Sequence, residues 1–201
     1  MRAEEVIALY TLLVEREVRV WVNGGWGIDA LLAEQTRPHK DFDALVLLDD
    51  LGTLADVLAC RGFTLKEIWE ENRWVPHTAR LQLIGKARRG GGDVATAFVL
   101  RNGTGHELDV HALTFDDCGY AIPAWNADIS FPSDALEGRG MIAGTPVRCL
   151  SAPMQMATHT GYALQAKDLQ DLRLLHDRFG IPYFGIPYLE AQSHHFPTSG
   201  T

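Results

Sequence analysis

The sequence predicts an α+β domain in which a mixed β-sheet is flanked by helices, with further helices at the C-terminal end. Two observations lead to this class. Apolar residues recur at helical spacing near both ends of the chain, and short segments between them show the alternating or continuous apolar pattern of strands. The order of helix, strand, helix, strand, helix, several strands and then helices is that of a mixed sheet with helices on one side.

The first third of the chain is expected to alternate helices and strands. Val6, Tyr10 and Leu13 give the first segment an apolar face. The glycines after Asn23 break the first strand, and Gly62 is a C-terminal cap for the third helix. The expected helices span residues 4–17, 26–34 and 51–61, and the expected strands span residues 18–22 and 41–48. The second strand is fully apolar at its far end, which is typical of a central strand.

The remainder is expected to be mostly β and then helical. Strands are expected over residues 63–70, 74–84, 94–101 and 106–113, with turns at 90–92 and 102–103. An irregular segment (121–138), a hairpin (141–149) turning at Gly144-Thr145 and two helices (152–164 and 168–178) should follow. We therefore expect one domain over residues 1–150, a helical segment packed on it over residues 151–190, and a disordered tail over residues 191–201.

Composition excludes several classes of protein. The 201 residues carry a formal net charge of -8, which argues against a nucleic-acid binder because such a protein needs a broad basic face. The three cysteines lie far apart and form no Cys-x-x-Cys pair, so a disulfide framework or structural zinc site is not expected. The first 17 residues resemble an amphipathic helix rather than a signal peptide, and no apolar run approaches the length of a membrane span. We expect a cytoplasmic protein without a membrane partner.

Asp41 and Asp43 are the candidate metal-binding pair. Side chains alternate along a strand, so both carboxylates project from one face while Phe42 points to the other. Two carboxylates about 7 Å apart on one face repel each other. Magnesium, which takes one or two carboxylates together with substrate phosphates, would supply the counter-charge. Asp-x-Asp also occurs where a strand begins in solvent, and this alternative stays open at this point.

Two neighbouring features fit the handling of phosphate. Gly24 and Gly25 lie between a strand and a helix, where exposed backbone N–H groups and the positive end of the helix dipole can meet a phosphate. Residues 37–40 (RPHK) place three basic side chains directly before Asp41. A Gly-Gly pair is also common in simple turns, and a charged loop is usually only solvated.

A second polar strand face lies further along the chain. Glu107, Asp109 and His111 share one face of the expected strand, while Leu108 and Val110 point to the other. If this strand lies beside the Asp41 strand, Asp109 completes a site with three carboxylates, the number that suits two metal ions. A half-exposed edge strand with an ordinary polar face is the alternative.

The segment VNGGWGIDALLAEQTRPHKDFD (residues 22–43) resembles the signature region of the antibiotic nucleotidyltransferases. Among them it is most like the lincosamide nucleotidyltransferases and more distantly like the aminoglycoside 2″-adenylyltransferases, both in the polymerase-β-like superfamily. The shared positions are Gly24, Gly25, Trp26, Asp29, Arg37, His39, Asp41 and Asp43. Residues 107–113 resemble the strand with the third carboxylate, which falls on Asp109, and residues 167–172 resemble a following helix whose basic residue is Lys167. The resemblance covers most of residues 19–179.

The resemblance implies a polymerase-β-like fold and a catalytic domain over residues 1–150. It implies transfer of a nucleoside monophosphate, AMP from ATP, to a hydroxyl of an antibiotic, with two Mg²⁺ ions and release of pyrophosphate. Asp41 and Asp43 would bind both ions, and Asp109 would bind one ion and activate the hydroxyl, as a general base or solely as a ligand, with Glu107 as the substitute. The triphosphate would be contacted by Gly24, Gly25, Arg37, His39 and Lys167. Arg37 and His39 have the alternative role of ordering the loop before the strand.

The acceptor is the part of the function that the sequence leaves open. Residues 86–104 predict a longer hairpin than in compact family members, and the strand after Asp43 lacks an acid that some relatives carry. Acids beside tryptophans would suit an aminoglycoside, whereas a lincosamide needs more apolar contact: Glu67, Trp69, Glu70, Glu71, Trp74, Asp116, Asp117 and Trp125. A nucleotidyltransferase acting on a protein or RNA and a non-catalytic nucleotide-binding domain are the alternative functions. The oligomeric state and the nucleotide preference also stay open.

Overall fold

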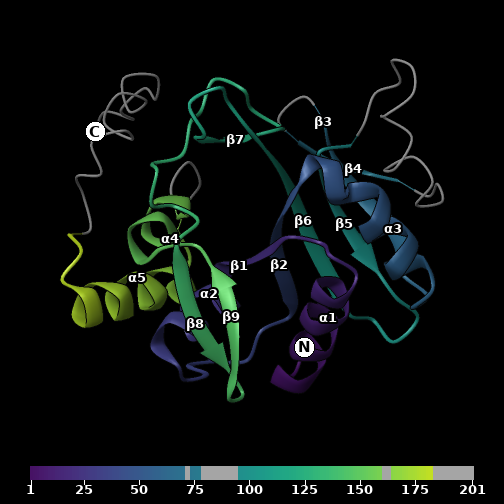
Figure 1. Ribbon diagram of the computed structural model, residues 1–201. Coiled ribbons are helices and arrows are strands. Elements are labelled where there is room, and N and C mark those ends of the chain that lie inside the picture. The colour runs from purple at the N-terminus through teal and green to yellow at the C-terminus, as the bar shows by residue number, and fades with distance from the viewer. Residues whose placement is uncertain (71–72, 78–94, 160–163, 183–201) are drawn as a thin grey trace, which may run out of the picture.

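The computed structural model describes residues 1–70, 73–77, 95–159 and 164–182 (Figure 1). The strands of this part form one mixed sheet in the order β4-β3-β5-β6-β2-β1-β9-β8, with β7 paired to β6. The strands are β1 (Val20–Asn23), β2 (Asp41–Leu47), β3 (Thr64–Glu70), β4 (Arg73–Pro76), β5 (Ala97–Arg101), β6 (Glu107–Phe115), β7 (Ala121–Pro123), β8 (Gly138–Ile142) and β9 (Thr145–Cys149). The pairs β2–β6 and β1–β9 are parallel and the others antiparallel, which confirms the predicted α+β class.

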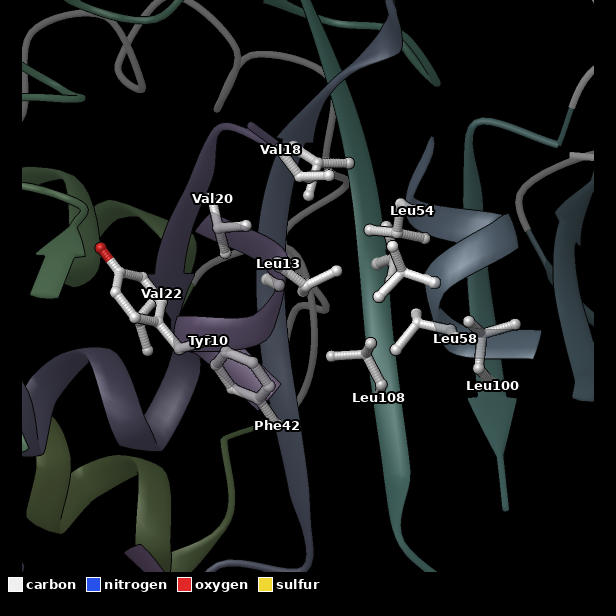
Figure 2. Packing of buried hydrophobic residues seen from close by; sticks show 14 of the residues in the cluster. Tyr10, Leu13, Val18, Val20, Val22, Phe42, Leu54, Leu58, Leu100 and Leu108 are labelled. Atoms are coloured by element: carbon white, nitrogen blue, oxygen red, sulfur yellow. The ribbon is translucent and has the colours of Figure 1, made fainter. Parts of the chain in front are cut away.

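The helices divide between two regions of the sheet. They are α1 (Ala3–Glu15), α2 (Gly24–Leu32), α3 (Leu51–Ala59), α4 (Ala152–Thr158) and α5 (Ala166–Phe179), with a 3₁₀ turn η1 (Leu48–Asp50). Leu13 on α1 and Leu54 on α3 pack over Phe42 and Leu108 of the central strands, so these two helices cover one face (Figure 2). Helices α2, α4 and α5 share a separate apolar cluster around Ile28, on the α5 side of Figure 1.

The second face of the sheet is covered at one end. Leu45, Leu47 and Leu113 pack against the segment after β7 and against α4. The other end of the same face carries the polar residues at the start of β2 and β6. An apolar patch therefore borders a polar one along the two central strands, and the polar end is where the candidate site lies.

Several expected element boundaries were wrong. Helix α2 begins at Gly24 instead of Trp26, so the glycines form its first turn. Residues 121–138 are not wholly irregular, because Ala121–Pro123 pair with β6 as β7 and bury two of their three side chains. The hairpin begins at Gly138 instead of Met141, and it turns at Ala143 and Gly144, whose φ angles of 47° and 78° suit a tight hairpin turn.

Other expectations lie partly outside the described residues. Strand β4 ends at Pro76, and residues 78–94, which include the first part of the expected longer hairpin and its glycine turn, are not described. The expected tail over residues 191–201 also lies outside. The boundary expected at residue 150 falls between β9 and α4 and stays a prediction. None of the helices in the described part is long and apolar enough to cross a membrane.

Candidate active site

The parallel pairing of β2 with β6 brings the predicted carboxylates together. Asp43 pairs in register with Asp109, and Asp41 pairs with Glu107. Register partners in a sheet share a face, and neighbouring strands lie about 4.8 Å apart. Phe42 and Leu108 point to the opposite face and are fully buried. Core packing on one face therefore fixes the carboxylates on the other.

This arrangement disfavours full ionisation of the carboxylates. Burial, followed by repulsion from Asp41, raises the pKa of Asp43 to about 7, although Lys167 and Arg37 act in the opposite direction. Burial and the charge of Asp43 raise the pKa of Asp109 well above its usual range. A cation among these groups would remove the repulsion, so the charges on this face favour binding of one.

Asp109 also carries an unsatisfied buried oxygen. Its Oδ1 atom has no hydrogen-bond partner, and it lies 3.3 Å from His111 Nδ1, close to it but outside hydrogen-bond geometry. Burial lowers the pKa of His111 to about 4, so this imidazole is neutral at pH 7 and does not form an ion pair with Asp109. An orphaned carboxylate oxygen beside Asp43 suits a hard cation such as magnesium. Among the described residues, however, no three His, Cys, Asp or Glu side chains are already gathered as a metal site.

The two predicted glycines allow backbone to approach the site closely. Gly24 has a φ of +58°, and a Cβ atom there would overlap the Asp43 carboxylate. A Cβ atom on Gly25 would overlap the His39 ring and lie within 2.7 Å of Arg37 Nη2. Glycine is therefore required at both positions. The first turn of α2 therefore lies directly against Asp43.

A cavity of about 480 Å³ opens beside Asp41 and Asp43. Its lining gathers all five residues that were expected to contact the triphosphate: Gly24, Gly25, Arg37, His39 and Lys167. Asp109 is not part of this lining and lies next to the cavity through its register partner Asp43. The sequence-based interpretation did not assign Asn23, Lys40, Thr158, His159 and Asp168, which also line the cavity. Lys40 carried a signal as the last residue of the basic loop, and Asn23 and Asp168 lie within the segments that resemble the family, residues 22–43 and 167–172.

Arg37 and His39 hold the loop before β2 in addition to lining the cavity. Arg37 donates from Nε and Nη2 to the two oxygens of Asp171 on α5, at 3.1 and 2.6 Å. His39 Nε2 lies 2.5 Å from Asp29 Oδ2, and the other oxygen of Asp29 accepts hydrogen bonds from Thr36. These bonds support the loop-ordering alternative for both residues. They also connect α2, the loop and α5, the helix that carries Lys167.

Glu107, the expected substitute for Asp109, is engaged elsewhere. Its carboxylate lies 3.0 Å from both Lys40 Nζ and Lys66 Nζ. Burial opposes its ionisation, yet the hydrogen bonds from Lys66 and Lys40 lower its pKa below the ordinary value. Glu107 is therefore a charged partner for two lysines, which leaves Asp109 as the third carboxylate available to a metal.

Comparison with known proteins identifies the same family as the sequence motifs. Residues 5–86 and 87–175 match the model of the aminoglycoside-2''-adenylyltransferase family. A lincosamide resistance protein of Staphylococcus haemolyticus is 24% identical over 182 residues, which is 86% of this chain and 92% of that protein. A 2''-aminoglycoside nucleotidyltransferase of Escherichia coli is 27% identical over 161 residues, which is 75% of this chain and 70% of that protein.

Solved structures show the same fold. The lincomycin-bound lincosamide antibiotic adenylyltransferase LnuA matches with a TM-score of 0.66 and 22% identity, covering 86% of this chain and 94% of that one. ANT(2")-Ia in complex with adenylyl-2"-tobramycin matches with a TM-score of 0.61 and 20% identity, covering 87% of each chain. The fold expected from the resemblance is confirmed.

Proposed function

The chain belongs to the aminoglycoside-2''-adenylyltransferase family, and on this basis we propose that it transfers AMP from ATP to a hydroxyl of an antibiotic. Pyrophosphate would be the second product, and modification of the antibiotic would confer resistance. The observation that carries the proposal is the in-register pair of Asp43 and Asp109 beside a cavity lined by Gly24 and Lys167. We propose a cytoplasmic location for this activity because the reaction would consume ATP.

The cavity supplies the groups that a triphosphate needs. The first turn of α2 presents backbone N–H groups at Gly24 and Gly25, and the helix dipole adds positive potential there. Lys167 on α5 also lines the cavity, and its charge favours the charged form of Asp43. We propose that these groups bind and orient the triphosphate, and that Arg37 and His39 contribute mainly by fixing the loop.

The site fits two magnesium ions because it offers the carboxylate oxygens and negative charges of Asp41, Asp43 and Asp109. The Oδ1 atom of Asp109 also lacks a hydrogen-bond partner. When bound, magnesium would neutralise charge on the triphosphate and favour ionisation of the attacking hydroxyl. Asp41 and Asp43 would hold both ions and Asp109 one. Burial and the neighbouring carboxylates raise the pKa of Asp109, and a cation bound beside it would lower that pKa again. We propose that Asp109, ionised in this way, accepts the proton of the acceptor hydroxyl. The neutral His111 beside it adds no competing charge.

The test is an assay with ATP, magnesium and antibiotics of the lincosamide and aminoglycoside classes. We expect pyrophosphate release only when an accepted antibiotic is present, and mass spectrometry should find that antibiotic carrying one AMP unit. The Asp43→Asn variant should form no adduct, whereas Asp56→Asn, at an exposed position on α3, should retain full activity. Absence of adducts with every antibiotic, or near-normal turnover by Asp43→Asn, would contradict the proposal. Labelling of a protein or RNA instead would support the macromolecular alternative.

A further inference from the structure

Four aromatic side chains lie beside Asp109 on the same face of the sheet; we call Trp69, Trp74, His111 and Trp125 the aromatic row. The Trp69 and Trp74 rings lie 5.3 Å apart, Trp74 and His111 6.0 Å apart, and His111 and Trp125 4.7 Å apart, each measured between centroids. His111 follows Asp109 by two residues on β6 and shares its face. The row therefore passes beside the carboxylate that we assign to the acceptor hydroxyl, with His111 as the nearest member.

None of the four members of the aromatic row is fully buried. Trp26 and Trp21, by contrast, have 1% and 7% exposure and belong to the core. Rings that contact one another while remaining partly exposed form a wall suited to a ligand with an apolar face. Trp21 and Trp26 therefore belong to the core, whereas Trp69 and Trp74 contact each other at intermediate exposure, and Trp125 is partly buried against the cluster of Leu45 and Leu113.

The carboxylates that β2, β3 and β6 present on this face already have either a proposed role in metal binding or a lysine partner. Asp41, Asp43 and Asp109 form the proposed metal set. Glu67 lies 3.3 Å from Lys66 Nζ, and Glu107 lies 3.0 Å from both Lys66 and Lys40. A ligand with several ammonium groups would have to displace these lysines before it could pair with either glutamate.

Other acids that were expected to meet a polycation are placed differently. Asp116 accepts hydrogen bonds from the backbone N–H groups of Cys118 and Tyr120 and thereby shapes a turn. Glu70 follows Ile68 onto the opposite face of β3. Glu71 lies outside the described residues. The described part of this face is therefore richer in aromatic rings than in acids available to a cation, and Asp117, in the exposed turn after β6, is the remaining acid of the expected set.

Taking the proposed function as given, we infer that the acceptor is a sugar derivative with at most one positive charge, the chemistry of a lincosamide, and not a polyamine aminoglycoside. The C–H face of its saturated ring packs on the aromatic row, which excludes water and places a ring hydroxyl beside Asp109. Trp74 and Trp125, on either side of His111, determine this specificity. Specificity thus comes from apolar complementarity and from the lysines, which repel further positive charge.

The test compares lincomycin with tobramycin as acceptors at saturating ATP and magnesium. We expect kcat/KM for lincomycin to exceed that for tobramycin by at least about tenfold. Trp74→Ala and Trp125→Ala should each raise KM for lincomycin about tenfold and leave KM for ATP unchanged. Trp74→Phe should restore most of the affinity because it keeps an aromatic face. Phe179→Ala, which removes an exposed ring at the end of α5, is the matched control and should change neither constant.

The outcomes separate this inference from the proposed function. Preference for tobramycin, or tryptophan variants that leave KM for lincomycin unchanged, would overturn the inference while the adenylyl transfer stands. If neither antibiotic is modified, the proposed function fails. Titration of tryptophan fluorescence with lincomycin then tests ligand binding to the aromatic row by itself. Saturable quenching by lincomycin that is lost in the double variant Trp74→Phe plus Trp125→Phe would support binding to the aromatic row. Absence of quenching in the wild type would overturn the inference.

Discussion

Gly24 lies so close to the carboxylate of Asp43 that a methyl group at position 24 would overlap Oδ2 of that residue. The backbone of the first turn of α2 thus meets the Asp43 side chain of β2 directly, because Gly24 has no side chain of its own. This contact explains why the strand-to-helix turn carries a glycine in the left-handed region, with a φ of +58°. It also makes position 24 a sensitive probe of the site.

Gly24→Ala should abolish adenylyl transfer while the protein still folds. The new methyl group must push the Asp43 carboxylate out of place, and alanine at this φ adds about 1 kcal/mol of backbone strain. Activity and thermal unfolding are the measurements. The matched control is Gly52→Ala on α3, where a Cβ atom meets nothing within 4 Å. This control should keep full activity and gain stability, by about 0.5–1 kcal/mol. Normal turnover by Gly24→Ala would show that the contact does not matter.

Asp109→Asn should remove most of the stabilisation that magnesium and nucleotide give to the folded protein. A ligand that binds the native state and not the unfolded state raises the melting temperature, by about 5 °C or more for a well-occupied site. The asparagine variant loses one carboxylate of the proposed set but keeps its shape. Thermal unfolding with and without magnesium and the non-hydrolysable α,β-methylene analogue of ATP measures the difference. An equal shift in wild type and variant would remove Asp109 from the metal set, and Asp117→Asn serves as the charge-matched control.

Asp171→Ala should destabilise the fold, by about 3 kcal/mol, because it leaves the guanidinium of Arg37 without its bidentate partner. Asp171 is 1% exposed and Arg37 19% exposed, so solvent cannot replace the lost bonds fully. Urea unfolding gives the stability. The KM for ATP should rise as well, since α5 carries Lys167 to the cavity. Arg2→Ala, in an exposed pair with Glu5, should have a much smaller effect. Similar losses in both variants would argue against a special role for the Arg37 pair.

Stability should fall at alkaline pH through the buried thiol of Cys149. Burial raises its pKa in the folded protein to about 12, whereas an exposed thiol ionises at about 8.5. Above the lower value the unfolded chain releases a proton that the folded chain keeps, so stability falls as pH rises, with a slope of up to about 1.4 kcal/mol per pH unit. Urea unfolding of wild type and Cys149→Ala at about pH 7.5 and about pH 10 should show the larger loss in wild type. Cys60→Ala, at an exposed cysteine, should behave as wild type.

Local patterns were sufficient for much of the fold and for the composition of the site. The alternation over residues 107–111 correctly separated a polar face from a core face, because side-chain direction follows directly from strand geometry. The glycine pair and the aspartate pair were identified by their order along the chain. Local patterns failed where a segment takes its structure from a distant partner: β7 forms because Ala121 and Pro123 pair with β6.

The sequence by itself determined which side chains are available for chemistry, since spacing within one strand or one turn sets their direction over a few residues. Tertiary structure alone decided which of them meet. Register between β2 and β6 placed Asp109 opposite Asp43 and Glu107 among lysines. Arg37 donates a hydrogen bond to Asp171, which lies 134 residues further along the chain. Such long-range contacts are decided by core packing and loop closure, which no local spacing records.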